Sequence, residues 1–478
     1  MEITSFGSAL FIAVVFGLYW TVARWGGRVQ NGVLLLASGL FYGLADHRFL
    51  LLLVLSASTN YGIAISLGRI RSRRLRTALF YTGVGLDLGL LCWFKYMAFF
   101  RPGIEHLLHA MGFGGDHGLI AVVLPLGISF YTFQMLGYLI DVQREETEPC
   151  TDALAFLTYV LFFPKILAGP IERAQRFLPQ IGQARNFDMA LATDGLRQVL
   201  WGLLAKVVIA DNASTFVDLV FNAPGTVTAS THLVGALLYF VQIYCDFSGY
   251  SNMAIGIAKL FGIRLMTNFN TPFFSVGVND FWKRWHISLT TWMIDYVFTP
   301  LSFLLRDLGR AGTTIAISAT FLAVGIWHGA NWTFVIFGTV QSLLFLPLAL
   351  TGSITRSAAT TGRLPCVPPF ARMAGTFVLM MLCFVLLRSA TLQDAITYYR
   401  GLLGPGLLSK PEVFPTTVMF MALVFVLVEW VQRGRAHAMD LAGMRMPIWL
   451  RWGLYAVIVF VLALMNNTGS YNFIYFQF

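Results

Sequence analysis

The longest stretches of this sequence carry almost no charge. Between Glu2 and Arg24 there is no ionisable side chain other than one tyrosine, and about residues 5–23 form an apolar run. As a helix, such a run is long enough to cross the roughly 30 Å hydrocarbon core of a bilayer. Because 57% of the 478 residues are hydrophobic and only 12% are charged, polar side chains are too few to cover soluble globules. The sequence therefore predicts one all-α polytopic membrane domain.

Further apolar runs resemble the first in length. Together with the middle of the chain they predict about 11 to 14 spans, and the clear ones lie at about residues 31–45, 49–68, 77–100, 312–329, 332–350, 373–388, 415–431 and 452–466. No basic residue precedes the first run, which therefore lacks the basic region of a signal peptide. We expect it to remain in the mature protein as a span.

Positive charge is concentrated in short loops and sums to a net +10. Arginines follow the first span at 24 and 28 and the third span at Arg69–Arg76, a pattern that places these loops in the cytoplasm and the N-terminus outside. Basic residues within 356–372 and 433–451 predict two more cytoplasmic loops and an outer C-terminal tail. The Arg69–Arg76 run is expected to be a solvated loop that contacts lipid headgroups, and the alternative is a docking site for an acidic cytoplasmic carrier. A nucleic-acid partner is excluded because no soluble basic module is present.

The middle third of the chain departs from this regular pattern. Its apolar stretches are short, and prolines and ionisable residues interrupt them. Irregular backbone at membrane depth is tolerated only where protein or water covers it. We therefore divide the single domain into N-terminal spans (1–118), a catalytic core with broken or re-entrant helices (119–350) and C-terminal spans (351–478).

Two histidines lie in unusual surroundings. His286 closes a segment rich in tryptophan and cations, and His328 lies between two apolar runs, flanked by Gly325 and Gly329. A neutral imidazole can take a proton from a hydroxyl group and return it, which suits a general base. The glycines predict that another group can approach His328 closely, and Asn331 is expected on the same helical face. The alternative is a purely structural hydrogen bond to a helix break.

A second polar segment lies inside an apolar run. If it is helical, Gln242, Asp246 and Tyr250 form one stripe of hydrogen-bonding side chains. One hypothesis is that this stripe is a structural network between helices. The alternative is that Asp246 orients a catalytic histidine or serves as its charge partner. The five cysteines lack the spacing of a disulfide framework or a zinc site, so no metal is expected.

Eight segments in order along nearly the whole chain resemble the membrane-bound O-acyltransferase family, and within it the branch of the alginate O-acetyltransferase membrane subunits. They are Phe94–Tyr96, Leu124–Gln134, Phe162–Lys165 with Ala168–Ile171, Lys206 with Ala210–Asn212, Tyr244–Tyr250, Asn279–His286, Trp327–Gly329 and Phe473–Phe478. One such segment alone would be weak evidence, whereas eight in sequence identify the family.

The resemblance implies a fold, a site and a reaction. The implied fold is a ring of tilted helices around a thinned centre, with a funnel leading to His328, the family's active-site histidine. His286 and Asn279 match a second polar position. His328 is expected to act as the base, and Asn279 and Trp327 to steady the oxyanion. Supporting or substrate-binding roles are expected for Tyr244, Asp246, Gly329 and Asn331.

The implied reaction moves an acetyl group from a cytoplasmic thioester toward an extracytoplasmic polysaccharide of the alginate type. The donor is acetyl-CoA or an acyl carrier protein, and no tightly bound cofactor is expected. Transfer proceeds directly or through a periplasmic acetyltransferase partner, in the inner membrane of a bacterium. Cellulose, peptidoglycan and teichoic acid are alternative acceptors within the family. A transporter or flippase that uses the buried ionisable residues as an ion pathway is the alternative from another functional class.

Overall fold

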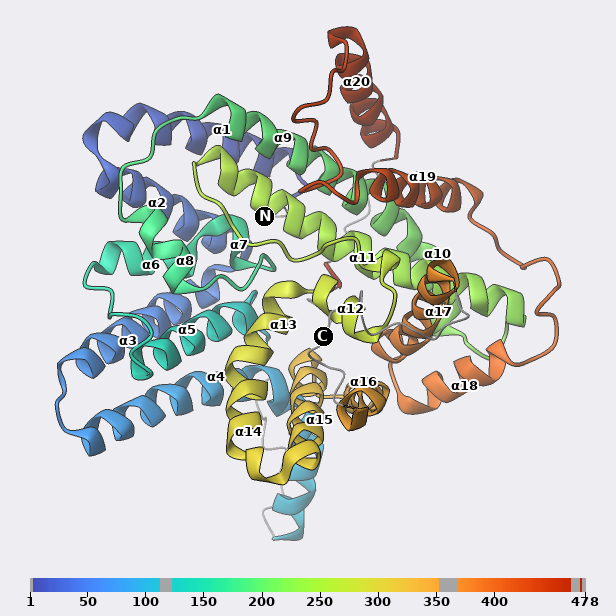
Figure 1. Cartoon of the computed structure of the whole chain (residues 1–478), viewed down its shortest axis with the longest axis horizontal. Helices are drawn as coiled ribbons and strands as arrows, with labels where there is room; N and C mark the ends of the chain where they lie inside the picture. Colours follow the sequence, from blue (N-terminus) through green and yellow to red (C-terminus); the bar gives the residue numbers. More distant parts are fainter. Residues whose placement is uncertain (1–2, 112–122, 352–367, 466–472, 475–478) are drawn as a thin grey trace. The chain divides into compact units, whose positions relative to one another are not determined.

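The computed structural model describes residues 3–111, 123–351, 368–465 and 473–474 (Figure 1). Within these ranges the ordered elements are helices and no strand occurs, which confirms the predicted all-α class. The predicted loop with Arg356 and Arg363 and the last four residues of the C-terminal motif lie outside the described residues.

Eight segments of the described ranges are long and apolar enough to cross a membrane, and Thr416–Gln432 is a shorter apolar helix. The eight are Phe6–Trp25, Gly27–Arg69, Arg73–Met97, Ala229–Leu260, Arg306–His328, Trp332–Thr351, Pro369–Arg388 and Ile448–Met465. The apolar runs near both ends of the sequence therefore became helices where they were predicted, and the chain is a multi-pass membrane protein. The count of about 11 to 14 spans and the division into three parts stay predictions.

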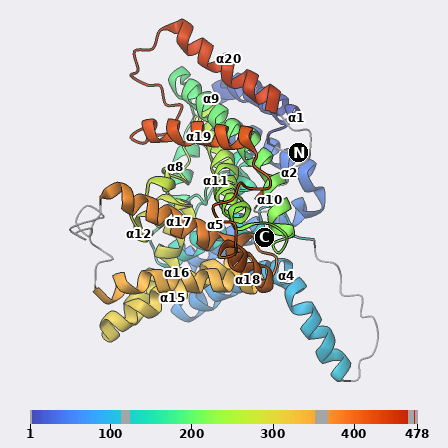
Figure 2. The same ribbon diagram turned by 90° about the vertical axis from the view of Figure 1, so that its right-hand side faces the viewer.

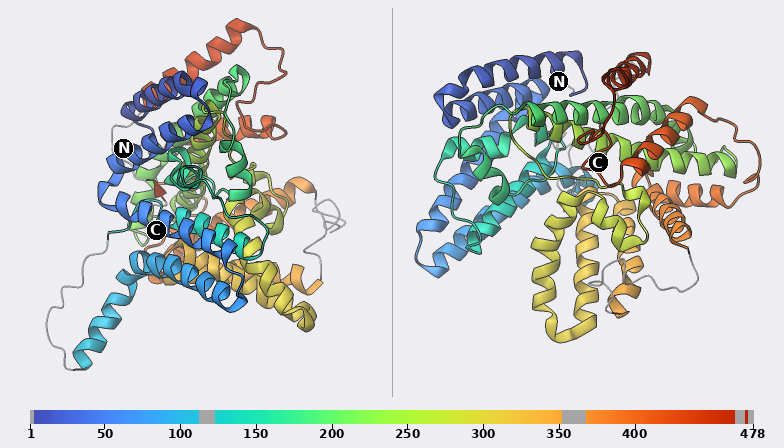
Figure 3. Two further views of the ribbon diagram at one scale, coloured as in Figure 1. Left: turned by 90° about the vertical axis from the view of Figure 1, so that its left-hand side faces the viewer. Right: turned by 45° about the horizontal axis from the view of Figure 1, so that its top comes forward.

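The chain forms two compact units, and the first comprises Met1–Met189 and Leu260–Leu265. Its helices are α1 (Phe6–Thr21), α2 (Gly27–Asp46), α3 (Leu50–Arg69), α4 (Arg73–Ala110), α5 (Ile128–Gln143), α6 (Ala153–Leu161), α7 (Phe163–Ile166) and α8 (Ala174–Ile181). Figure 3 shows α1 alongside α2. Buried Arg185 joins these two helices, because its Nε donates to the Tyr19 hydroxyl at 2.5 Å and its second guanidinium nitrogen donates to Asn31 at 2.7 Å.

The second unit comprises Ala190–Lys259 and Met266–Phe478. Its helices are α9 (Met189–Leu203), α10 (Asp211–Asn222), α11 (Ala229–Leu260), α12 (Val278–Arg284), α13 (Ile287–Met293), α14 (Thr299–Leu304), α15 (Gly309–His328), α16 (Trp332–Thr351), α17 (Pro369–Arg388), α18 (Leu392–Leu402), α19 (Thr416–Gln432) and α20 (Ile448–Met465). The π-helical turns η3 (Leu204–Ala210) and η5 (Ile294–Phe298) follow α9 and α13. The short helices α12 to α14 fit the expected broken middle segment.

Helix α11 is the buried centre of the second unit, and glycines let α9 approach it. Gly195 and Gly202 are two turns apart on α9 and face Gly256 and Gly249 of α11. A Cβ atom at Gly202 would lie 2.5 Å from the Gly249 carbonyl oxygen, so no side chain fits there. This close approach of small residues is the usual way in which membrane helices associate without a hydrophobic driving force. The polar stripe of α11 is buried, with Gln242, Asp246 and Tyr250 at most 7% exposed.

Candidate active site

His286 lies at a break between two short helices of the second unit. Helix α12 ends at Arg284, and α13 begins directly after His286, whose backbone has φ 42° and ψ 55°. This left-handed conformation is costly for a residue with a side chain. Hydrogen bonds hold it in place, because Asn268 accepts from the Ile287 N–H at 2.8 Å and from the Ser288 N–H at 3.3 Å. The break turns the imidazole into the protein, where only 1% of the residue is exposed.

His328 is the last residue of α15, directly before the turn into α16. The two helices form a tight pair, which Figure 2 shows side by side. A Cβ atom at Gly325 would lie 2.4 Å from the Phe334 carbonyl oxygen, and one at Gly329 would lie 2.6 Å from the Phe334 ring. Another group does approach closely at these glycines, as expected, and that group is Phe334 of α16. The space is filled by α16, because glycines at this crossing serve helix packing.

Asn331 also differs from its prediction. It lies in the turn after α15, so it does not share a helical face with His328. Its side-chain oxygen accepts from the Thr333 N–H at 3.1 Å, and its amide donates to the Ala390 carbonyl at 2.7 Å. The first bond caps the N-terminus of α16 and the second ties the turn to the end of α17. The expected helical spacing failed because the helix ends at His328.

Trp327 brings the two histidines into one aromatic cluster. Its ring centroid lies 5.7 Å from that of His286 and 5.1 Å from that of His328. Phe247 of α11 contacts the other side of His286 edge-on, with centroids 4.6 Å apart. Both histidines are buried, at 1% and 5% exposure. Two segments distant in the sequence thus place two imidazoles beside one indole, and a third segment supplies Phe247.

The environment of His286 keeps its ring neutral. His286 lies outside the candidate spans, and its burial, followed by the proximity of His328, holds the pKa of His286 well below its usual range. Both causes disfavour the protonated form. A neutral imidazole can accept a hydrogen bond or a proton, but the lowered pKa makes His286 a weaker base than an ordinary histidine.

Asp246 belongs to a neighbouring charged cluster. Lys206 pairs with Asp246 at 2.6 Å and with Asp211 at 2.7 Å, while the second Asp246 oxygen accepts from the Ile474 N–H at 2.8 Å. These contacts join α9–α10, α11 and the C-terminal tail. They match the hypothesis that the polar stripe is a structural network between helices. Both oxygens of the Asp246 carboxylate contact Lys206 or the C-terminal tail, and neither is seen to contact a histidine within the described ranges.

Tyr244 pairs with a residue that the sequence analysis missed. Its hydroxyl donates to the Glu429 carboxylate at 2.7 Å, and both residues are buried. Glu429 is the only acidic residue of α19, an otherwise apolar helix. A lone carboxylate in such a run is costly unless it has a partner, which was the signal available in the sequence.

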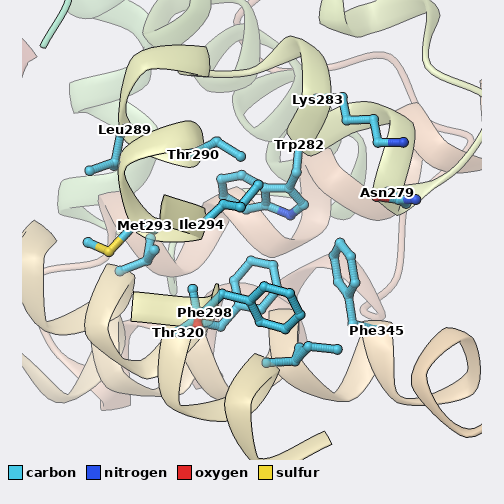
Figure 4. Close-up of a pocket in the computed structure, with 13 residues that line it drawn as sticks. Asn279, Trp282, Lys283, Leu289, Thr290, Met293, Ile294, Phe298, Thr320 and Phe345 are labelled. Atoms are coloured by element: carbon cyan, nitrogen blue, oxygen red, sulfur yellow. The ribbon is translucent and has the colours of Figure 1, made fainter. Parts of the chain in front are cut away.

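Asn279 lies beside an apolar cavity of about 140 Å³ that α12, α13 and η5 form with α15 and α16. Figure 4 shows Asn279 near Lys283 at one edge of this cavity. Neither histidine lines it. The role of Asn279 in steadying an oxyanion stays a prediction, as do the catalytic roles of His286, His328 and Trp327. Within the described ranges no group of three potential metal ligands occurs.

Comparisons with known proteins place this chain in a family. The model of the membrane-bound O-acyltransferase family matches residues 149–391. The probable alginate O-acetylase AlgI of Pseudomonas aeruginosa is 35% identical over 83% of this chain and 74% of its own length. The chain belongs to the membrane-bound O-acyltransferase family. It is an O-acyltransferase, as the eight segments predicted.

Other relatives extend this result. The probable alginate O-acetylase AlgI of Azotobacter vinelandii is 33% identical over 91% of this chain and 85% of its own length. The peptidoglycan O-acetyltransferase of Helicobacter pylori is 32% identical over 78% of this chain and 73% of its own length. The matched region of the family model includes α11, His286 and His328, so the candidate site lies within the part shared with the O-acyltransferase family.

Proposed function

We propose that this O-acyltransferase moves an acetyl group from a cytoplasmic thioester to a polysaccharide outside the cytoplasmic membrane of a bacterium. The observation that carries the proposal is the pairing of His286 and His328 around Trp327, within a family that acylates hydroxyl groups. The similarity to alginate O-acetylases favours an alginate-type polymer. Peptidoglycan is the second candidate acceptor, because the Helicobacter pylori relative carries that name.

In the proposed reaction His328 acts as the general base. The acceptor oxygen attacks the carbonyl carbon of the thioester, so a C–O bond forms and the C–S bond breaks. The hydroxyl proton passes to the imidazole of His328 and from there to the departing thiolate. His286, kept neutral by its burial, binds or relays a proton beside it. General-base help of this kind contributes about 10²- to 10⁴-fold to a rate.

The acetyl donor is proposed to be acetyl-CoA or an acylated carrier protein on the cytoplasmic face. Exposed arginines at the end of α3, in the turn and at the start of α4 offer a positive surface to such anionic donors, namely Arg69, Arg71, Arg73 and Arg74. The acceptor is either the polysaccharide itself or a hydroxyl of a periplasmic acetyltransferase partner. In both cases the acetyl group crosses the membrane while the donor does not.

Sidedness in sealed proteoliposomes tests this function. Radiolabelled acetyl thioester is supplied only on the face that carries the Arg69–Arg76 loop, and a deacetylated alginate oligosaccharide is enclosed on the other face. Acetylated oligosaccharide is expected without any ion gradient. Transfer that required both substrates on one face would contradict the crossing of the acetyl group but not the enzyme class.

The same vesicles address the transporter hypothesis. The relatives described above are acyltransferases by name and give that hypothesis no support. Movement of an intact substrate coupled to an ion gradient, with no thioester consumed, would be its signature. Consumption of the thioester in the absence of a gradient is the result expected here.

A further inference from the structure

The cavity beside Asn279 is enclosed mainly by apolar side chains of the second unit (Figure 4). Met293 of α13 and Ile317 and Val324 of α15 line it and are at most 6% exposed, and Phe345 of α16 lines it at 7%. Well-packed interiors leave few voids, because side chains around a void lose dispersion contacts. An apolar cavity of about 140 Å³ therefore gains contacts when an apolar group occupies it.

The position of the cavity favours an occupant from the bilayer. Its floor is formed by α15 and α16, both candidate membrane spans, so the cavity lies at the depth of those helices. Ile294, which also lines it, is 43% exposed. The cavity thus reaches the outer surface of the second unit at an apolar residue. A group that enters there comes from the hydrocarbon region.

One edge of the cavity carries a positive charge. Lys283 lines the cavity and is exposed, and within the described ranges it forms no ion pair, whereas its neighbour Arg284 is paired with Asp280 at 2.9 Å. Figure 4 shows Lys283 beside Asn279, while Leu289 and Met293 lie at the opposite side. An apolar cavity with a cation at one edge matches an amphiphile that has an alkyl chain and an anionic head.

We propose that this cavity binds part of an alkyl chain of an anionic membrane phospholipid, with its phosphate next to Lys283. An engineered apolar cavity of about 150 Å³ holds benzene, so the space suits a stretch of roughly five or six carbons. The remaining lipid lies along the exposed surface near Ile294. This binding site is independent of the proposed acetyl transfer. It would couple lipid composition to the packing of α15, which ends at His328, against η5, which continues the helix that begins after His286.

Photocrosslinking tests the proposal on the full chain in lipid nanodiscs. The probe is phosphatidylglycerol with a diazirine near the middle of one acyl chain, and peptide mass spectrometry locates the label. Label is expected on buried Met293 and Phe345, which bulk lipid does not reach. Ile317→Phe should lower this label several-fold by filling the cavity. Ile315→Phe is the matched control, because Ile315 lies on the same helix, is 49% exposed and does not line the cavity.

A second pair of variants leaves the core untouched. Lys283→Gln should lower the preference for phosphatidylglycerol over phosphatidylcholine about fivefold, the equivalent of about 1 kcal/mol for one basic residue at an anionic surface. Lys283→Arg should keep the preference. Label at Met293 that persists in Ile317→Phe, or equal labelling by both lipids in the unmodified protein, would overturn the proposal. Displacement of the label by a hexanoyl thioester would assign the cavity to an acyl donor and would also overturn it.

Discussion

Lys206 and Asp246 form a 2.6 Å ion pair in the interior of the second unit. Asp246 directly precedes Phe247, whose ring contacts His286. Lys206 also pairs with Asp211, so one ammonium group holds two carboxylates from different helices. The cluster therefore anchors α11 at the residue directly before Phe247.

Removing the cation of this cluster should cost more stability than removing one anion. Lys206→Met leaves the buried carboxylate of Asp246 and the partly exposed carboxylate of Asp211 without their ammonium group, and breaking a buried pair in this way costs about 3–5 kcal/mol. Asp246→Asn leaves Lys206 paired with Asp211 and should be milder. Thermal unfolding of both variants in the same detergent gives the comparison. Equal midpoints for the two variants would show that the cluster does not stabilise the unit as described.

His328→Ala should abolish acetyl transfer while the protein inserts at its normal level, because loss of a general base costs at least about 10²-fold in rate. His47→Ala is the matched control, since His47 is exposed and lies in the first unit. The measurement is acetate release from polymer made by cells that carry each variant. Activity above about a tenth of the unmodified enzyme would exclude His328 as the base.

His286→Asn should distinguish the contribution of the His286 imidazole from that of its left-handed backbone conformation. Asparagine adopts the left-handed conformation more readily than most residues, so the break at φ 42° should survive. We expect a raised KM for the donor and a smaller change in kcat, which fits a supporting role. The initial rate against donor concentration provides both constants. A collapse of kcat at an unchanged KM would make His286 a direct catalytic partner.

Gly325→Ala should lower activity without touching a histidine. The added Cβ atom meets the Phe334 carbonyl oxygen at 2.4 Å, so α15 and α16 must separate and His328 must move. Gly375→Ala is the control, because a Cβ atom at that position of α17 has no neighbour within 4 Å. Unfolding midpoints and activity are measured together. Unchanged activity of Gly325→Ala would mean that the helix pair does not position His328.

Asp194 should hold the segment between α19 and α20 at every physiological pH. Its carboxylate binds His437 at 2.9 Å and Lys259 at 2.5 Å. Burial acts to raise the pKa of Asp194, but the hydrogen bonds from His437 and Lys259 outweigh it and hold the pKa well below the usual range. A lowered carboxyl pKa adds stability above its usual value of about 4, and this stability is lost as pH falls toward the lowered value.

Hydrogen exchange of residues 433–447 measures this contact. Protection, corrected for the intrinsic exchange rate, should be constant between about pH 5 and 8 and fall below about pH 4. Asp194→Asn should already lack the protection at pH 7. Loss of protection in the unmodified protein near pH 6 would contradict the role of Asp194.

The site was only partly accessible from the sequence. His286 and His328 stood out because ionisable residues in apolar surroundings are costly and therefore have a reason to be there. The expected position of Asn331 was wrong, because spacing along an ideal helix does not apply where α15 ends at His328. Glu429 was missed, since its partner Tyr244 is 185 residues away in the sequence.

The sequence by itself determined the all-α membrane class and the helices near both ends of the chain, because membrane spans depend on the length and composition of a continuous segment. It also determined the family. Only the tertiary structure decided that Trp327 lies beside both His286 and His328 and that Lys206 pairs with Asp246. It also decided that an apolar cavity lies between α13 and α15. Such contacts join residues that are distant in the sequence. They depend on how close two helices can come. Here glycines such as Gly202 and Gly325 allow a close approach because they have no side chain.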